Sequence, residues 1–418
     1  MLRIGGPGRY PPITATSPSL AAVCADATST VGGPVTGATM AIMRDAVIVE
    51  AVRTPIGKRN GALSGVHPGD LTAHVLTQVA ERTGLDPALV DDVIWGCVSQ
   101  VGDQAGSVGR VGVLAAGWPE SVPATVVDRR CGSAQQAAHF AAAGVIAGQY
   151  DIAIAGGVES MSRVPMGSAR GDGRPYPPSV LDRYGVDGFN QGLGAEMMAA
   201  KWGLTRTQLD EYSARSHERT AAAIDAGAFA GQLAPIAGLE NDEGLRRGTT
   251  VESLATLKTP FDADGVVTAG NASQISDGAA ALLVTTTEIA LANGWQPIAR
   301  VHTAVLAGDD PVIMLTAPIA ATAKALSRSG LSVSDIGVFE VNEAFAPVPL
   351  AWQAEIGASD DVLNPLGGAI AVGHPLGGSG AILMTRMVHH MRDNGIRYGL
   401  QTMCEAGGMA NATILELL

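Results

Sequence analysis

The stretch that decides the fold is "VDRRCGSAQQAAHFAAAGVIAG", Val127 to Gly148, in which a polar turn leads into a long run of small residues. The run is rich in alanine, a strong helix former, and it stops at a glycine, a common helix end. Cys131 therefore stands at the start of a predicted helix, where the helix dipole and free backbone N–H groups lower the pKa of a thiol. Arg129 and Arg130 would add positive potential if they point inward. A small, buried structural cysteine is the alternative.

Strand and helix signals alternate on both sides of this stretch. Before it, the apolar run Val47 to Val52 predicts a strand, and the spacing of Leu71, Val75 and Val79 predicts a helix closed by Gly84. After it, "DIAIAGGVESM" predicts another strand. This alternation indicates the α/β class, with parallel strands joined by helical crossovers.

A second copy of the pattern follows at a constant distance along the chain. "VDDVIWGCVSQ" carries Asp92 and "VSDIGVFEVNEAF" carries Asp335, and 335 − 92 = 243. Cys131 precedes "GSAQQAA" and His374 precedes "PLGGSGA", and 374 − 131 = 243. A predicted strand follows the helix in each copy, "DIAIAGGVESM" in the first and "LQTMCEAGGMA" in the second. The chain is predicted to be a duplicated α/β unit in which His374 takes the place of Cys131.

The duplication divides the chain into parts. The expected parts are an extension at 1–42, a first half at 43–161 and 277–305, an inserted loop domain at 162–276 and a second half at 306–418. The extension shows no periodicity and is predicted to be disordered, or to precede the true start at Met40 or Met43; a transit peptide is the other interpretation. The insert is richer in charge, proline and glycine, and long inserts in compact folds are usually functional.

Composition narrows the classes of function. Apolar residues make up 46% of the 418 and charged residues 16%, which favours an extensively buried protein and argues against disorder. A net charge of −13, from 27 basic and 40 acidic residues, disfavours nucleic-acid binding. No apolar run is long enough to predict a membrane span. The four cysteines form no CxxC pair, so neither a disulfide framework nor a metal site is predicted, and a cytoplasmic protein is expected.

Four candidate side chains stand at turns between predicted strands and helices. Besides Cys131 they are Asn342 in "NEAFA", His374 in "GHPLGGSG" and Cys404 in "CEAGG". Such turns converge at the carboxyl ends of strands in α/β sheets. Singly, each residue has a structural reading: a buried cysteine, a turn-capping asparagine or a turn histidine. Together, a thiol nucleophile, an imidazole base, an amide donor and a second thiol suit acyl transfer with carbon–carbon bond chemistry.

The series of motifs resembles the thiolase family, the acetyl-CoA acyltransferases. Between Ala46 and Leu418 the chain carries, in the order typical of that family, "VDRRCGSAQQA", "AGGVESMS", "TAGNASQISDGAAAL", "VNEAFA", "GGAIAVGHPLGGSGA" and "MCEAGGMA". The resemblance implies a layered αβαβα fold with an inserted loop domain. It also implies a homodimer or homotetramer that works in fatty acid β-oxidation or related lipid metabolism without a metal or redox cofactor.

The resemblance implies a role for each candidate residue. Cys131 would form an acyl-enzyme, His374 would be its base, and Cys404 would be the acid/base at the α-carbon. Asn342, holding a water, would polarise the substrate thioester oxygen together with His374. The backbone N–H groups of Cys131 and Ala406 would form a second oxyanion hole. The implied reaction is the reversible thiolytic cleavage of a 3-oxoacyl-CoA by CoA, more often degradative, with ping-pong kinetics.

Binding of CoA by an acidic protein requires local positive charge. Candidates in the insert are Arg215, His217, Arg219, Arg246 and Arg247. Solvated helix faces are the alternative interpretation for most of these. By resemblance, Ser273 would lie near the pantetheine arm of CoA.

Two departures from the family pattern bear on the substrate. Ala406 stands where the family usually has the first glycine of Cys-x-Gly-Gly-Gly, and residues 191–196 read "QGLGAE" where the family has Met-Gly-x-Thr-Ala-Glu. Both changes alter the expected pocket wall. They favour a larger acyl chain, branched or steroid-derived, over a strictly acetoacetyl-CoA-specific enzyme.

Three other functions stay open at this point. A ketoacyl synthase shares the duplicated fold and the cysteine nucleophile, but it would not need a second thiol such as Cys404. A thiolase-like lipid carrier would have lost catalytic positions that this chain retains. A cysteine hydrolase would also leave Cys404 without a role, and around Ser379 the order of residues does not match the GxSxG elbow.

Overall fold

The structure, a computed structural model, describes residues 44–418, and the strands of this part form one hydrogen-bonded path. The strands are β1 (Val47–Arg53), β2 (Gly57–Lys58), β3 (Asp92–Gly96), β4 (Ala124–Val127), β5 (Ile152–Ser160), β6 (Ser276–Thr285), β7 (Ala299–Gly308), β8 (Val338–Val341), β9 (Tyr398–Glu405) and β10 (Met409–Leu417). The helices are α1 (Pro68–Thr83), α2 (Val108–Ala115), α3 (Ser133–Ala147), α4 (Pro178–Tyr184), α5 (Gln191–Lys201), α6 (Arg206–Asp225), α7 (Val251–Ala255), α8 (Thr287–Ala292), α9 (Ala317–Ser329), α10 (Pro347–Ile356), α11 (Ala369–Val372) and α12 (Ser379–Asn394). The predicted extension at 1–42 lies outside the described residues.

The path consists of two similar halves joined at β1 and β7. Its order is β4-β3-β5-β6-β1-β7-β10-β9-β8, with β2 beside β6. β1 and β7 share the pairs Val47↔Arg300 and Ile48↔Ala299, whereas β7 pairs with β10 along its whole length. In the first half β3 is parallel to β4 and β5, and in the second β8 is parallel to β9; the other pairs are antiparallel. The predicted α/β class with parallel crossovers is confirmed.

The two halves repeat at an offset of 246 residues. β3 begins at Asp92 and β8 at Val338, and 338 − 92 = 246. α3 begins at Ser133 and α12 at Ser379, and 379 − 133 = 246. β5 and β9 also begin 246 residues apart, since 398 − 152 = 246. The predicted duplication is present in the strand pairing.

The predicted offset of 243 residues is wrong. At 246, the residue at the place of Cys131 is Gly377, and His374 lies three residues before it. Asp335 ends a short 3₁₀ turn before β8, whereas Asp92 is already in β3. The two segments can be aligned three residues out of register in the sequence, because aspartates and small residues recur near the starts of strands and helices. Hydrogen-bond pairing between strands permits only one register.

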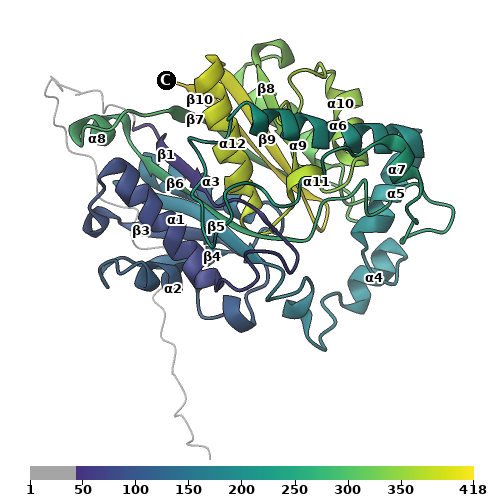
Figure 1. The fold of residues 1–418 in the computed structure, drawn as a ribbon, viewed down its shortest axis with the longest axis horizontal. Coiled ribbons are helices and arrows are strands. Elements are labelled where there is room, and N and C mark those ends of the chain that lie inside the picture. Colours follow the sequence, from purple (N-terminus) through teal and green to yellow (C-terminus); the bar gives the residue numbers. More distant parts are fainter. Residues whose placement is uncertain (1–43) are drawn as a thin grey trace, which may run out of the picture. The chain divides into compact units, whose positions relative to one another are not determined.

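The helices form three layers around the two halves of the path. α1 and α2 pack on the outer side of the first half, and α9 packs on that of the second. α3 and α12 pack against each other between the halves, and Figure 1 shows them at the centre of the molecule. The expected αβαβα layering is therefore confirmed. Alanines such as Ala134, Ala137 and Ala141 are fully buried in α3, which lets this central helix pack closely.

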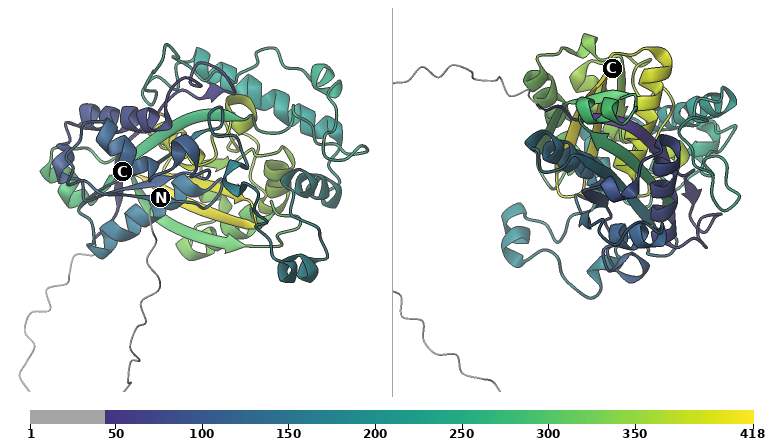
Figure 2. Two further views of the ribbon diagram at one scale, coloured as in Figure 1. Left: turned by 90° about the horizontal axis from the view of Figure 1, so that it is seen from below. Right: turned by 90° about the vertical axis from the view of Figure 1, so that its left-hand side faces the viewer.

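The segment between β5 and β6 carries helices α4 to α7 and, among the described residues, no strand. α6 packs on α11, and α5 packs on α10, so these helices rest against the second half. Figure 2 shows the segment at the periphery of the layered body. The expected boundary at 305/306 falls inside β7, a strand whose pairing lies mainly with β10. Within residues 44–418 no helix is both long and apolar enough to cross a membrane.

Candidate active site

Cys131 lies in an apolar environment at the start of α3. Its thiol is 3% exposed and packs with Leu383 and Met403. Burial raises the pKa of this thiol well above its usual range, and negative charge on Cys404 and Glu405 adds to the rise. The expected lowering of this pKa by the helix terminus is therefore wrong in direction, because desolvation outweighs the favourable N–H groups. The resting thiol is protonated and requires a base to become a nucleophile.

The arginines before Cys131 differ in their surroundings. Arg130 is exposed, adopts a positive φ of 49° and pairs with Asp128 at 3.4 Å. Arg129 is half-buried, and its Nε is buried without a hydrogen-bond partner. The Arg129 charge also contributes to lowering the pKa of buried His139, so the guanidinium lies near the interior.

His374 lies in the loop between α11 and α12, and Ser379 orients its ring. The Ser379 hydroxyl donates to the Pro375 carbonyl at 2.8 Å, so its oxygen accepts the Nδ1–H of His374 at 2.6 Å. This tautomer leaves a lone pair on Nε2, which is buried and has no partner. Burial lowers the pKa of His374 to about 4, so the imidazole is neutral at pH 7. A neutral ring with an unpartnered Nε2 suits a general base.

Asn342 and Cys404 are in direct contact. The Asn342 Nδ2 donates to Cys404 Sγ at 3.7 Å, and its Oδ1 is buried without a partner. Burial raises the pKa of Cys404 to about 11, while the Asn342 hydrogen bond and the N–H groups of Cys404 and Ala344 oppose that rise. The second thiol therefore has stabilising donors around a developing thiolate.

Long-range contacts bring the four candidate turns together. Charge on Cys404 acts on Cys131, and Asn342 contacts Cys404. The starts of α3 and α12 are tied to β9, because the Gln401 amide donates to Gln135 Oε1 at 2.9 Å and to the Gly380 carbonyl at 2.8 Å. The turns of Cys131, Asn342 and Cys404 thus meet where β8 and β9 end, and the His374 loop leads into α12 beside them.

The turn after Cys404 explains how alanine is accepted at 406. Positive φ angles of 94° and 73° occur at Gly407 and Gly408, and Ala406 has no positive φ. Glycine is required at the two later positions, whereas the backbone at Ala406 suits any residue. Ala406 is half-buried, next to the buried pair Cys404 and Glu405.

The candidates for CoA binding lie in the insert and at its edge. Ser273 is half-buried, and its N–H donates to the Ala344 carbonyl at 2.9 Å, which places it beside the "NEAFA" turn. Arg247 is exposed, forms an ion pair with Asp225 at 2.7 Å and lines a groove of about 350 Å³ with His217.

The other basic candidates in the insert are engaged differently. The Arg246 backbone N–H donates to His217 Nδ1 at 3.2 Å. Arg215 and Arg219 both pair with Asp360, at 2.9 and 3.0 Å. These two pairs fix the insert to the second half, which favours a structural role for both arginines.

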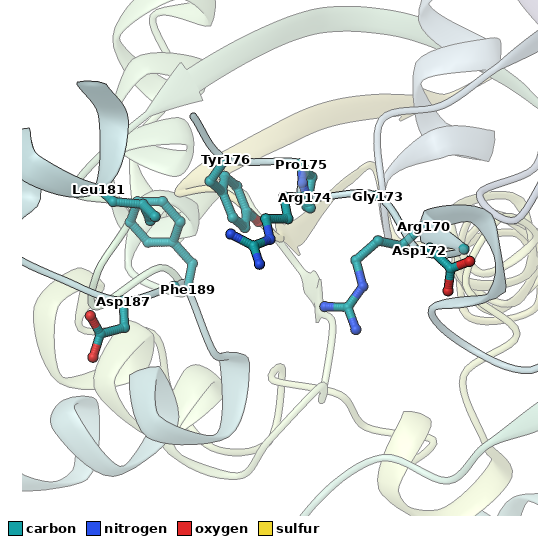
Figure 3. Close-up of a pocket in the computed structure, with 11 residues that line it drawn as sticks. Arg170, Asp172, Gly173, Arg174, Pro175, Tyr176, Leu181, Asp187 and Phe189 are labelled. Atoms are coloured by element: carbon teal, nitrogen blue, oxygen red, sulfur yellow. The ribbon is translucent and has the colours of Figure 1, made fainter. Parts of the chain in front are cut away.

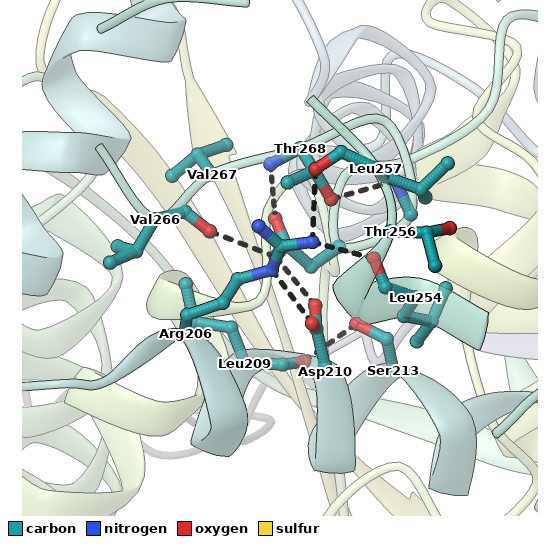
Figure 4. A network of polar contacts seen from close by, with 12 residues as sticks. Arg206, Leu209, Asp210, Ser213, Leu254, Thr256, Leu257, Val266, Val267 and Thr268 are labelled. Atoms are coloured by element: carbon teal, nitrogen blue, oxygen red, sulfur yellow. Dashed lines mark hydrogen bonds and ion pairs between the residues drawn. The ribbon is translucent and has the colours of Figure 1, made fainter. Parts of the chain in front are cut away.

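Sequence reasoning missed a cluster that holds the Ser273 segment. Arg206 Nε donates to Asp210 Oδ2 at 2.7 Å, and its Nη2 donates to the Leu254 carbonyl at 2.5 Å (Figure 4). Asp210 Oδ1 accepts from Asn271 Nδ2 at 3.0 Å. The cluster joins α6 and α7 to the residues just before Ser273. The i, i+4 spacing of Arg206 and Asp210 was the available signal.

Glu343, next to Asn342, was also missed. Its carboxylate accepts from Tyr212 at 2.9 Å, from Ser216 at 2.7 Å and from the Ile370 N–H at 3.1 Å. Glu343 thereby ties the "NEAFA" turn to α6 and to α11, the helix that leads to His374. No pattern in the sequence identifies these partners, which are more than 25 residues away.

A groove in the insert lies apart from the candidate residues. It has a volume of about 620 Å³ and is lined by insert residues, among them Arg170, Arg174 and Tyr176 (Figure 3). Phe189 stacks edge-on against Tyr176 at 4.8 Å between ring centroids. In residues 44–418 there is no group of three or more His, Cys, Asp or Glu side chains arranged to hold a metal ion.

Comparison with protein families matches almost the whole described chain. Residues 46–288 match the family described as "Thiolase, N-terminal domain", and residues 295–417 match "Thiolase, C-terminal domain". The chain belongs to the thiolase family. This thiolase is therefore an acyltransferase, and its family division at 288–295 places β7 with the second half.

Several similar proteins are thiolases that act on different acyl-CoA substrates according to their names. This thiolase is 47% identical over 401 residues to a steroid 3-ketoacyl-CoA thiolase of Mycobacterium tuberculosis, covering 93% of this chain and 98% of the relative. It is 42% identical to a beta-ketoadipyl-CoA thiolase of Escherichia coli, covering 90% and 100%. Among solved structures, the Bacillus anthracis acetyl-CoA acetyltransferase matches with a TM-score of 0.82 and 35% identity, covering 90% and 99%.

Proposed function

We propose that this thiolase cleaves 3-oxoacyl-CoA with CoA, in the degradative direction, through an acyl group carried on Cys131. The observation that carries the assignment of residues is the state of His374, a neutral imidazole whose buried Nε2 has no partner. Two buried thiols and Asn342 lie at the neighbouring turns. The relatives at 47% and 42% identity are named as a steroid 3-ketoacyl-CoA thiolase and a beta-ketoadipyl-CoA thiolase, which supports the same reaction here.

The first half-reaction uses one base and one acid. His374 Nε2 accepts the proton of Cys131, and the thiolate attacks the ketone carbon of the substrate. The Cα–Cβ bond breaks, the acyl group stays on sulfur, and the acetyl-CoA enolate takes a proton from Cys404 at its α-carbon. The N–H groups of Cys131 and Ala406 serve the oxyanion on the attacked carbon.

The second half-reaction returns both protons. The Cys404 thiolate takes the proton of an incoming CoA thiol, which attacks the acyl group on Cys131. Cys131 leaves as a thiolate and recovers its proton from His374. A water held by Asn342, together with His374, polarises the thioester oxygen. CoA enters as a substrate, and the chain needs no resident cofactor for these steps.

Mass spectrometry of the protein after incubation with acyl-CoA tests this assignment. We expect a mass increase equal to one acyl group, located on the peptide that contains Cys131, because the thioester intermediate accumulates without a second thiol. The Cys131→Ala variant should show no adduct. An adduct on Cys404 alone, or none on any cysteine, would contradict the assignment.

We propose further that the preferred acyl group is larger than acetyl, with a branched or steroid-derived chain. The relative at 47% identity is named for a steroid substrate. In this chain Leu193 of the "QGLGAE" segment lines a groove of about 340 Å³ together with Met197 and Leu204. The rest of the lining includes Glu196, Asp262 and Asp264. Thiolysis rates over a series of 3-oxoacyl-CoA lengths, with a ring-containing acyl-CoA included, test this preference. A sharp optimum at the four-carbon substrate would overturn it.

For CoA we propose contacts with Ser273, Arg246 and Arg247. Ser273 sits beside the "NEAFA" turn, and Arg247 lines a groove with His217. Positive charge there suits the phosphates of an anionic substrate in an acidic protein. The proposed compartment is the cytoplasm, because buried Cys97, Cys131 and Cys404 are free thiols and the reaction requires two of them reduced.

We also propose that the chain forms a homo-oligomer through β4 and α3. β4 is the edge strand of the first half, with its far side unpaired in the described chain. Next to it, α3 exposes Phe140 at 48% and Ile146 at 48%, and a groove of about 370 Å³ is lined by Phe140 and by Thr125 of β4. A second copy of the chain can continue the sheet across this edge and cover both side chains, as closed two-fold dimers do.

A further inference from the structure

Glu405 is a buried carboxyl with no hydrogen-bond partner; it follows Cys404 in the chain and lies against Gly132, the residue after Cys131. It lies at the end of β9, has 0% exposure, and neither of its oxygens has a partner. A Cβ added at Gly132 would lie 2.0 Å from Glu405 Oε1, so the carboxyl presses against the residue after Cys131. Buried polar groups are normally hydrogen-bonded, and an exception calls for an explanation.

The corresponding carboxyl in the first half is bonded very differently. It belongs to Glu159, since 405 − 159 = 246. Glu159 accepts from the N–H groups of Val98, Ser99 and Gly377 at 2.8 to 3.0 Å, and from the Gln104 amide at 2.8 Å.

The two carboxyls differ in whether they accept a hydrogen bond from the backbone N–H just before the central helix of the opposite half. Gly377, which donates to Glu159, occupies the place of Cys131, because 377 − 131 = 246. Glu405 accepts no bond from Cys131, so this N–H stays available for an oxyanion. Glu405 therefore does not repeat the structural role of Glu159.

Charged groups from the neighbouring elements act on Glu405. Burial raises its pKa to about 8, the charge of Arg129 opposes that rise, and the charge of Asp128 adds to it. In turn, negative charge on Glu405 raises the pKa of Cys404 and of Cys131. Glu159, on β5, acts on Cys131 in the same sense.

We propose that Glu405 is a positioning residue that holds a proton beside Cys131 and Cys404, with Arg129 as the cation that limits the cost of losing it. A neutral Glu405 lets either thiol carry the negative charge that each half-reaction needs. An ionised Glu405 places a second negative charge in the same low-dielectric site, which opposes thiolate formation. Arg129, unexplained by the motif that contains it, then has a function. The proposal rests on the proposed roles of the two thiols.

Alkylation of Cys131 by iodoacetamide, followed by peptide mass spectrometry over a pH series, tests the proposal on the full chain. In Glu405→Gln the charge is absent at every pH, so we expect the midpoint of alkylation to move down by on the order of one pH unit. Glu340→Gln is the matched control. Glu340 is also buried, with a pKa raised to about 8, but it lies on β8 and is not among the groups that shift either thiol. Its midpoint should equal that of the unmodified protein.

An unchanged or higher midpoint in Glu405→Gln would overturn the proposal, as would an equal shift in Glu340→Gln. If Glu405→Gln does not fold, Arg129→Gln examines the same electrostatic interaction from its other side. Without this cation Glu405 keeps its proton to higher pH, so the midpoint of Cys131 alkylation should move to lower pH. Arg130→Gln, which changes the exposed neighbour, is the control for it, and equal behaviour of these two variants would also overturn the proposal. Alkylation needs no substrate, so the result is independent of whether the protein cleaves 3-oxoacyl-CoA.

Discussion

A single hydroxyl decides which nitrogen of His374 is free. Because the Ser379 hydroxyl donates its hydrogen to the Pro375 carbonyl, its oxygen can only accept a hydrogen bond from Nδ1 of His374. The imidazole is thereby held in one tautomer, with Nε2 as the basic atom. Ser379 acts through His374, so it is a positioning residue.

Replacing Ser379 by alanine should slow the reaction without unfolding the protein. The variant loses the acceptor that selects the tautomer, and we expect kcat to fall by roughly tenfold or more, with a smaller change in KM. Steady-state thiolysis gives both constants. Ser168→Ala is a suitable control, because Ser168 also donates to a proline carbonyl but is exposed in the insert. Equal kcat values in the two variants would contradict the assigned role.

At the scale of elements, a cluster of side chains on helices α6 and α7 of the insert positions the segment that contains Ser273. Arg206 at the start of α6 binds the carbonyl of Leu254 in α7, and Asp210 holds Asn271. Two residues after Asn271 comes Ser273, which is tied to the Ala344 carbonyl. The position of the proposed CoA contact thus depends on the side chains of Arg206 and Asp210 in α6.

Replacing Arg206 by glutamine should weaken CoA use more than it slows the chemistry. The variant loses the charged bond to Asp210 and the contacts to α7, so the Ser273 segment becomes less well ordered. We expect KM for CoA to rise by several-fold, with kcat changed less, because a small misplacement of a binding segment costs affinity. Arg44→Gln serves as the control, because it also removes an ion pair, with Asp151, and bonds to two backbone carbonyls, but outside the insert. A lowered kcat with unchanged KM would argue against this role.

At the scale of the whole molecule, the edge formed by β4 and α3 predicts assembly. A Phe140→Asp variant should sediment as a smaller species than the unmodified protein, because a charge in the centre of an apolar contact is desolvated without a partner. Analytical ultracentrifugation measures this directly. Leu291→Asp, at a 55% exposed residue of α8, is the control and should leave the assembly unchanged. If the unmodified protein itself sediments as a monomer, the proposed interface does not exist.

Buried ionisable groups should give the whole molecule a stability maximum near pH 6.5. Burial lowers the pKa to about 4 at four histidines: His139, His217, His374 and His389. Their contribution is fully present above the unfolded pKa of 6.5 and is lost as the pH falls toward 4. Glu340 and Glu405, with pKa values raised to about 8, contribute below 4.5 and lose that contribution as the pH rises toward 8.

Among the groups with pKa values near 4 or near 8, the four histidines outnumber the two glutamates between pH 4.5 and 6.5, so these groups make stability rise with pH there. Above 6.5 the glutamates continue to lose their contribution, and stability should decline. Thermal unfolding at about pH 5, 6.5 and 8 checks the sign on each side. A Tm that keeps rising from about pH 6.5 to 8 would be inconsistent with carboxyls buried in their neutral form.

The amino-acid sequence by itself determined the order of strands and helices, the duplication and the turns that carry Cys131, Asn342, His374 and Cys404. These features depend on periodicity, caps and turn residues within a few positions of one another, so they can be read locally. The register of the duplication could not be read in this way, because strand pairing joins residues from separate segments.

The tertiary structure alone decided the protonation states of the catalytic candidates and the residues that surround them. The thiol of Cys131 becomes a weaker acid, and His374 becomes a neutral base, because side chains from other elements desolvate both groups. Glu405 meets Gly132, and Arg206 meets Leu254, across long separations in the chain. Burial and electrostatic interaction depend on distance in space, and only folding sets that distance.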